Sequence, residues 1–190
     1  MLMTYGNAIM LVLAGFIVQV VDFPIDAGFM TINLCSDIVA YILILLGLKP
    51  FLKEQNLLFR KCFKLTLALL IVEIFARLST CLDFGDSNAT IANLFLAVTS
   101  LIFMQLVYNY TETIMLQSKF LKIELNPGPL RGAYSAFCVV IIAYYVINAF
   151  YSFLSLYANI LLIICAIYYC GTMYTAKNKL YPPLIKKEYD

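Results

Sequence analysis

The chain has 190 residues, of which 63% are apolar or aromatic and 13% are charged, and its mean hydropathy is +0.90. A soluble domain is about half apolar and about a quarter charged, so this composition indicates an integral membrane protein in a lipid bilayer. A net charge of +2 disfavours nucleic-acid binding. The chain has no histidine, which excludes catalysis, zinc binding and haem binding that need an imidazole.

Six stretches are long and apolar enough to cross a bilayer, whose hydrocarbon core of about 30 Å needs about 20 helical residues. They cover residues 4–21, 29–48, 64–82, 89–108, 132–150 and 153–173. The charge-free run 133–174 would make about 63 Å of continuous helix, so we expect the chain to reverse near Tyr151 and Ser152. The sequence therefore predicts an all-α fold, a six-transmembrane-helix bundle at residues 1–176, followed by a basic cytoplasmic tail at 177–190.

The basic residues indicate the orientation of this bundle. Twelve of the 13 bases fall in the second connection, the fourth connection or the tail. They are Lys49, Lys53, Arg60, Lys61, Lys64, Lys119, Lys122, Arg131, Lys177, Lys179, Lys186 and Lys187. Because cytoplasmic loops carry an excess of Lys and Arg, we expect both termini to be cytoplasmic.

Arg77 is the exception, because it lies within the third predicted span, four residues after Glu73. An acid that precedes a base by four residues can pair with it on a helix. Asp37, in the second predicted span, is expected at the depth of Glu73, about 13 Å from the outer face. A charge at the centre of a membrane helix costs about 2.5–3.5 kcal/mol. We therefore expect these three residues to form either a coupled cluster that carries one exchangeable proton or a static ion-pair staple between two helices.

Further polar side chains of the predicted spans fall in their outer halves, whereas the inner halves are mostly aliphatic and aromatic. This pattern predicts an outward-facing pocket, closed toward the cytoplasm, for a small polar or zwitterionic ligand. Packing contacts between helices are the simpler explanation of any single polar stripe. The candidate ligand-binding residues are Asp37, Glu73, Arg77, Asn33, Tyr41, Gln19, Asn93, Asn148 and Asn159.

The cytoplasmic connections and the cysteines add fewer constraints. Residues 57–64 and 111–125 are amphipathic. Each is predicted either to lie on the membrane surface or to dock a protein partner on the cytoplasmic face. The six cysteines have no C-x-x-C or metal-ligand spacing, and we expect neither a metal nor another cofactor.

The segment Ser36-Asp37-Ile-Val-Ala40-Tyr41-Ile-Leu, followed by Gly47-Leu48, resembles a motif of an uncharacterised bacterial family of polytopic membrane proteins. That family carries Pro-Asp-(apolar)2-Gly-Tyr-(apolar)2 in an early span. This chain has Ser36 in place of the proline and Ala40 in place of the glycine. The resemblance implies a multi-pass protein of the bacterial cytoplasmic membrane and a role for Asp37, with no assigned activity.

Three functions remain open at this point. The leading hypothesis is binding or transport of a small polar solute, because the size and helix count are similar to those of the substrate-capturing subunits of vitamin-uptake transporters. The alternative is a structural, sensory or immunity membrane protein with a static ion-pair cluster. An intramembrane enzyme is the third: Glu73-Ile-Phe-Ala-Arg77 resembles part of the Glu-Glu-x-x-x-Arg signature of a family of membrane proteases. The chain lacks the second glutamate and the histidines of those enzymes, and we assign no catalytic residue.

Overall fold

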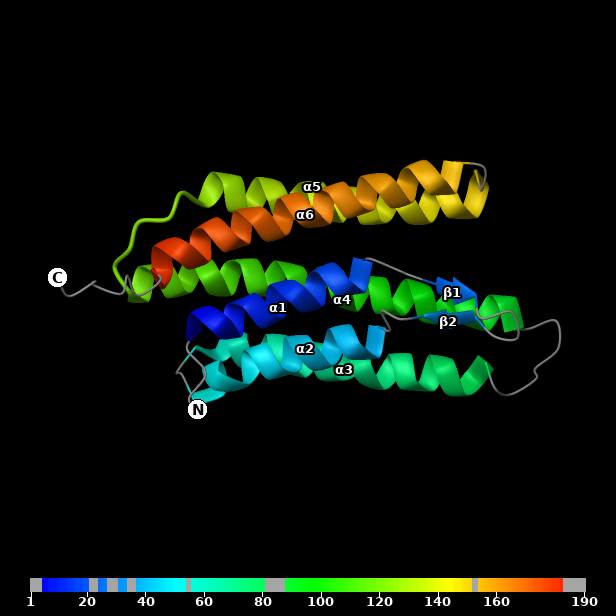
Figure 1. The fold of residues 1–190 in the computed structure, drawn as a ribbon, viewed down its shortest axis with the longest axis horizontal. Helices are drawn as coiled ribbons and strands as arrows, with labels where there is room; N and C mark the ends of the chain where they lie inside the picture. The colour runs from blue at the N-terminus through cyan, green and yellow to red at the C-terminus, as the bar shows by residue number, and fades with distance from the viewer. Residues whose placement is uncertain are drawn as a thin grey trace.

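The computed structural model describes residues 5–20, 24–26, 31–33, 37–53, 56–80, 88–151 and 154–182. These residues form six α-helices, one 3-10 helix and two short strands (Figure 1). In chain order they are α1 (Tyr5–Val20), β1 (Pro24–Asp26), β2 (Thr31–Asn33), α2 (Asp37–Leu48), η1 (Lys49–Lys53), α3 (Leu57–Thr80), α4 (Asn88–Phe120), α5 (Pro127–Phe150) and α6 (Ser155–Leu180). The predicted helical bundle is therefore present, with a small β-hairpin added to it.

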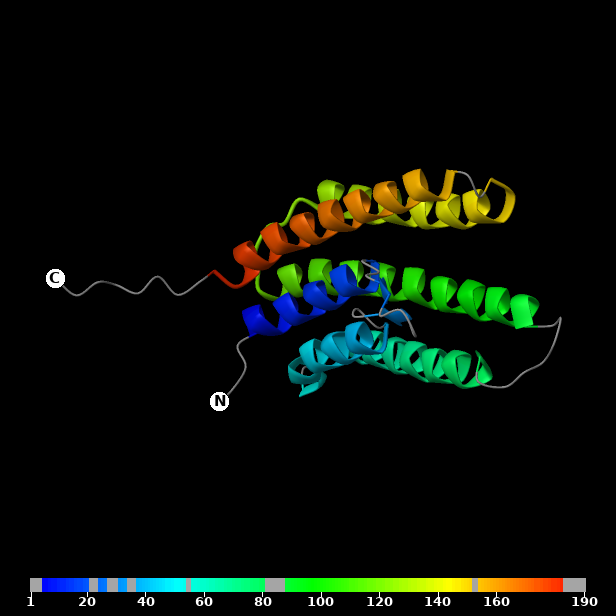
Figure 2. The same ribbon diagram turned by 45° about the vertical axis from the view of Figure 1, so that its right-hand side comes forward.

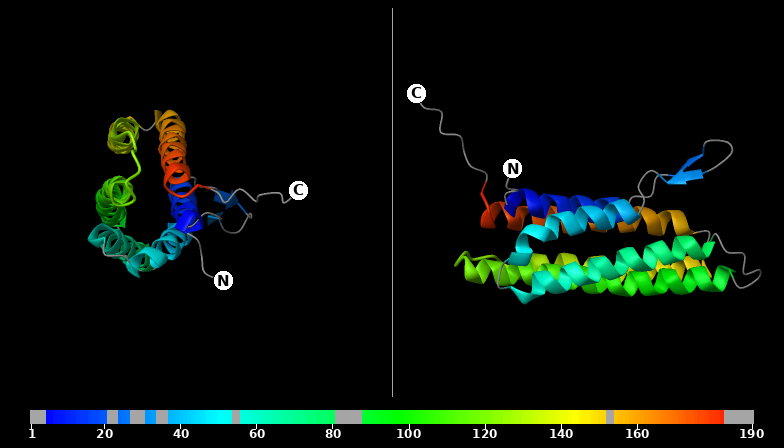
Figure 3. Two further views of the ribbon diagram at one scale, coloured as in Figure 1. Left: turned by 90° about the vertical axis from the view of Figure 1, so that its left-hand side faces the viewer. Right: turned by 90° about the horizontal axis from the view of Figure 1, so that it is seen from below.

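The six α-helices run up and down in chain order and form a ring (Figure 3). Each helix packs against its neighbours in the sequence, and contacts between α1 and α6 close the ring. Because successive helices alternate in direction, the start of α1 and the end of α6 lie at the same end of the bundle. Ten described bases lie at this end, which we call the basic end: Lys49, Lys53, Arg60, Lys61, Lys64, Lys119, Lys122, Arg131, Lys177 and Lys179.

The first, fifth and sixth helices lie close to their predicted positions. Helix α5 ends at Phe150 and α6 begins at Ser155, so the predicted reversal near Tyr151 is confirmed. Helix α6 continues to Leu180, so the predicted tail begins as helix. Within the described residues, the segment Leu156–Leu180 alone is both long and apolar enough to cross a membrane by length and composition, and α1 is apolar but shorter.

The second predicted helix is wrong in its first part. Helix α2 begins at Asp37 and has 12 residues, about 18 Å of helix at 1.5 Å per residue. Ahead of it, β1 and β2 pair antiparallel, with Ile25 opposite Ile32. A short apolar run suits a strand as well as a helix, and β-branched Thr31 and Ile32 favour the strand. Helices α1 and α2 therefore end well short of α3 and α4 at the end opposite the bases, which we call the far end (Figure 2).

The fourth predicted helix is too short. Helix α4 has 33 residues and continues to Phe120, whereas the sequence suggested an end at Tyr108 and a separate amphipathic segment at 111–125. Thr111, Thr113 and Ile114 are buried, so a surface position for this stretch is wrong. The polar side chains of this stretch make hydrogen bonds inside the bundle, so the helix can continue there without contact with water.

Aromatic side chains from four helices meet inside the ring. The ring of Phe16 makes edge contacts with the rings of Phe103, Tyr110 and Tyr169, at centroid distances of 5.8, 5.5 and 6.0 Å. Phe137 stacks on Tyr169 at 5.6 Å. Each aromatic pair adds about 0.5–1.5 kcal/mol beyond the area it buries. This cluster joins α1, α4, α5 and α6 and holds the ring closed.

Candidate functional site

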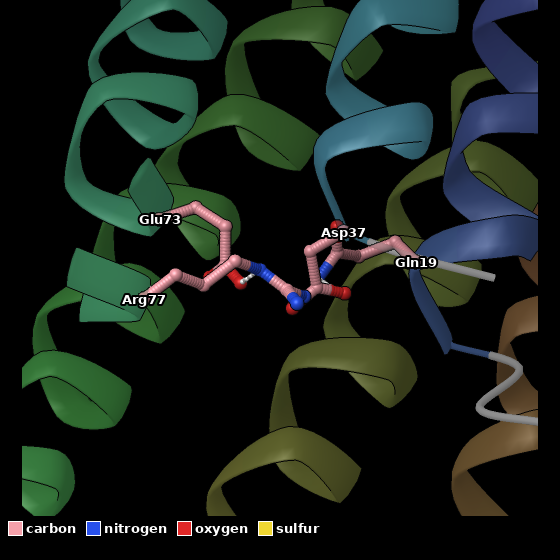
Figure 4. Close-up of polar contacts among 4 residues, drawn as sticks. All are labelled: Gln19, Asp37, Glu73 and Arg77. Carbon is pink, nitrogen blue, oxygen red and sulfur yellow. Dashed lines mark hydrogen bonds and ion pairs between the residues drawn. The ribbon is translucent and has the colours of Figure 1, made fainter. Parts of the chain in front are cut away.

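Four polar side chains from three helices gather near the far ends of α1 and α2 (Figure 4). We call Gln19, Asp37, Glu73 and Arg77 the charged cluster. Gln19 is the last residue but one of α1, and Asp37 is the first residue of α2. The side-chain amide Nε2 of Gln19 donates a hydrogen bond to Oδ1 of Asp37 at 3.0 Å. This bond ties the end of α1 to the start of α2.

Glu73 and Arg77 lie one turn apart on α3. The Nε of Arg77 donates to Oε1 of Glu73 at 2.9 Å, and the side chains of Arg77 and Glu73 are 46% and 13% exposed. The acid precedes the base by four residues, which is the favourable order for such a pair. The carboxylate of Glu73 is thus largely buried, whereas the side chain of Arg77 is about half exposed.

The two pairs point toward one another across the contact between α2 and α3 (Figure 4). Asp37 is in the first turn of α2, and Arg77 is in the last turn of α3. Helix dipoles favour an acid at an N-terminus and a base at a C-terminus, and the antiparallel packing of these helices places the start of α2 beside the last two turns of α3 (Figure 4). The cluster therefore combines local helix electrostatics with an attraction between helices.

Two features give the charged cluster its chemical character. It contains two carboxylates and one guanidinium, so its formal charge is negative when all three are ionised. The side-chain oxygen Oε1 of Gln19 is buried and has no hydrogen-bond partner among the described residues. A buried acceptor without a donor is unfavourable by about 1–3 kcal/mol. Both features suit a ligand that brings a positive charge and N–H donors.

Asp37 lies at the level of Glu73 along the bundle, but for a different reason than the sequence suggested (Figure 4). The expected position, nine residues inside the second span, is wrong, because α2 starts at Asp37 itself. The carboxylate lies near Glu73 and Arg77 because α2 begins part-way along α3. Glu73 is seven residues before the end of α3 at Thr80, a distance of about 10 Å along the helix.

The other predicted ligand-binding residues lie in different places. Tyr41 is buried on α2, one turn after Asp37. Asn159 has an exposed side chain on α6, a helix that contributes no residue to the charged cluster. Three more lie on β2, α4 and α5, and their side chains are outside the described part of the structure: Asn33, Asn93 and Asn148.

The sequence also misses a buried polar band on α4 toward the basic end. Thr111 Oγ1 lies 3.0 Å from the hydroxyl of Tyr169, and Gln117 Nε2 donates to the hydroxyl of Tyr181 at 3.1 Å. The sequence had placed this stretch outside the predicted spans, as part of the amphipathic segment 111–125. The available signal was the spacing of four residues between Asn109, Thr113 and Gln117, which places them on one face of a helix.

Comparisons with protein-family models, curated proteins and solved structures give no match. No residue role can therefore be carried over from a relative. Functional inference for this chain rests on the charged cluster, the surface of the bundle and its cavities.

Proposed function

We propose that this chain is a multi-pass protein of the bacterial cytoplasmic membrane, with its six-helix bundle embedded in the bilayer and its basic end in the cytoplasm. Large apolar side chains are exposed on all six α-helices. Examples are Ile17 on α1, Leu46 on α2, Phe75 on α3, Leu101 on α4, Val139 on α5 and Ile167 on α6. An apolar surface on every side of a bundle is typical of contact with lipid, and bases gathered at one end are typical of a cytoplasmic face.

Helices α3 to α6 are long enough for this arrangement, whereas α1 and α2 are shorter, and the short α2 gives the charged cluster its depth. Helices α3, α5 and α6 have 24 to 26 residues, about 36–39 Å, which exceeds the hydrocarbon core of about 30 Å. Helix α2 has 12 residues. With its basic end at the cytoplasmic interface, its start lies about 12 Å below the outer face.

We infer that the charged cluster binds a small solute that carries a positively charged amino group, and that the protein captures or transports it. The observation that carries this inference is the buried side-chain oxygen Oε1 of Gln19, which has no hydrogen-bond partner in the described part of the chain and lies in a cluster of two acids and one base (Figure 4). An ammonium group could meet Asp37 and that oxygen at once. Arg77 would hold the carboxylate of a zwitterion.

A static staple is the second candidate, because helix dipoles stabilise Asp37 and Arg77 where they are. The cluster would then only fix the register of α1, α2 and α3, as in a structural, sensory or immunity protein. A staple needs no ligand, and removal of one of its charged side chains destabilises the fold directly.

One comparison separates the two candidates. The wild-type protein and the variants Asp37→Asn and Arg77→Ala are purified in mild detergent, with Asn159→Ala as the control. Small molecules that copurify are measured by mass spectrometry, and unfolding is measured by heating. Binding predicts that both cluster variants lose a molecule that the wild type and the control retain, with little change in stability. A wild-type protein without any bound molecule, together with variants of much lower stability, would support the staple.

A labelling experiment tests the membrane orientation. Lys53 lies in η1 at the basic end and is exposed. The variant Lys53→Cys should react with a membrane-impermeant maleimide in inside-out vesicles and stay unlabelled in right-side-out vesicles. The wild-type chain gives the background from its own cysteines. Labelling in right-side-out vesicles would contradict the orientation.

A further inference from the structure

We propose a second site, at the basic end, that binds the phosphate headgroup and one acyl chain of an anionic phospholipid. The end of α4, the 121–126 connection, the start of α5 and the end of α6 form it. It is separate from the charged cluster and independent of any solute bound there. It rests only on the membrane part of the proposed function.

The first observation is a cavity of about 970 Å³ at this place. Four bases and two acids line it: Lys119, Lys122, Arg131, Lys179, Glu112 and Glu124. Arg131 Nη2 lies 3.6 Å from Oε1 of Glu112, so three lysines face one remaining glutamate. The cavity is therefore positively charged, and its volume is in the range of binding sites for small molecules. Basic pockets between helices on the cytoplasmic side suit anionic headgroups.

The second observation is a groove of about 380 Å³ that adjoins this cavity. Leu125, Asn126 and Lys179 line both spaces. The groove continues along α5 and α6 past Leu130, Tyr168, Gly171, Thr172, Thr175 and Ala176. Among the described residues, no side chain and no atom of another helix lies within 4 Å of the position that a Cβ of Gly171 would take, so the groove is open beside this glycine. A charged cavity joined to a mostly apolar groove fits an amphiphile better than free phosphate.

The third observation is the backbone of Lys122, which has a φ of 53°. The N–H of Ile123 donates to the carbonyl of Ser118 at 2.9 Å, and that of Lys122 donates to the carbonyl of Lys119 at 3.2 Å. These two bonds form the Schellman motif that ends α4. The position of Lys122 in this motif has a positive φ, and glycine is the usual residue there. A lysine is strained there, and this strained lysine is one of the residues that line the cavity.

Because of the positive φ of Lys122, one substitution at this position should raise the stability of the protein and lower its binding of the lipid. Lys122→Gly removes one charge from the cavity and relieves the backbone strain. The protein is reconstituted in nanodiscs that contain phosphatidylglycerol or phosphatidylcholine, and lipids that remain bound after detergent exchange are measured by native mass spectrometry. Lys61→Ala is the control, because Lys61 is an exposed base of the basic end that does not line the cavity.

We expect Lys122→Gly to unfold at the same or a higher temperature than the wild type and to retain about fivefold less phosphatidylglycerol, the effect of about one basic side chain near an anionic surface. Lys61→Ala should retain as much as the wild type. Equal losses in both variants would overturn the site in favour of a general surface charge, and equal retention of phosphatidylcholine would overturn its preference for anions. Displacement of the lipid by millimolar glycerol phosphate would identify a soluble phosphate ligand instead. Extraction of the protein from membranes by alkaline carbonate would contradict the membrane proposal itself.

Discussion

The contact between α1 and α2 depends on Gly15 and Gly47, and substitution of Gly47 tests it. A Cβ built on Gly47 would lie 2.5 Å from the carbonyl oxygen of Ala8 and 2.9 Å from the backbone nitrogen of Val12. Ordinary contacts between nonbonded heavy atoms are about 3.5–4.0 Å. Both neighbours are backbone atoms of α1, so no side-chain rotation can relieve the overlap. Gly47→Ala therefore forces the two helices apart.

The expected cost combines two opposing effects. Overpacking a tight contact costs about 1–3 kcal/mol, and replacing a helical glycine by alanine returns up to about 1 kcal/mol. The residues beside Gly47 are fully buried, among them Val12, Ile44 and Leu48, so separation of the helices also weakens their packing. We expect Gly47→Ala to lower the free energy of unfolding by about 1–2 kcal/mol.

Gly132→Ala is the matched control for this prediction. Gly132 lies in α5, and nothing lies within 4 Å of the position that its Cβ would take, so the same change should stabilise by up to about 1 kcal/mol. Circular dichroism during heating in detergent compares both variants with the wild type. A Gly47→Ala protein that unfolds at the wild-type temperature or above it would refute the close packing of α1 on α2.

Three further predictions concern the core and a helix end, and the same unfolding assay checks each of them. Phe16→Ala should destabilise by about 3–5 kcal/mol, because its buried ring contacts three others, whereas exposed Phe75→Ala should change little; similar losses in both would contradict the aromatic core. Thr111→Val and Tyr169→Phe should each cost about 1–3 kcal/mol and together cost less than their sum, since their hydroxyls are 3.0 Å apart, and strict additivity would argue against that contact. Asn126→Ala should cost about 1 kcal/mol, because Oδ1 of Asn126 accepts from the N–H of Gly128 at 3.1 Å, and an unchanged unfolding temperature would show that this cap contributes nothing.

The sequence determined the features that depend on short stretches of chain. Composition and the length of apolar runs predicted a helical bundle, and the polar residues near Tyr151 marked the turn between α5 and α6. The start of α5 was predicted less well, because the helix begins at Pro127 and not at residue 132, with prolines in its first turn. The pair of Glu73 and Arg77 could also be predicted, since residues four apart on a helix are neighbours in any tertiary structure.

Only the tertiary structure decided the features that depend on distant partners. Residues 31–33 fit a strand or a helix, and the pairing of β1 with β2 selects the strand there, so α2 starts only at Asp37. Thr111 lies inside the bundle because Tyr169, 58 residues away, supplies a partner for its hydroxyl. The cavity at the basic end likewise needs the ends of α4 and α6 side by side. Local hydropathy contains no information about such partners, because a polar group is stable in a core only when another part of the chain reaches it.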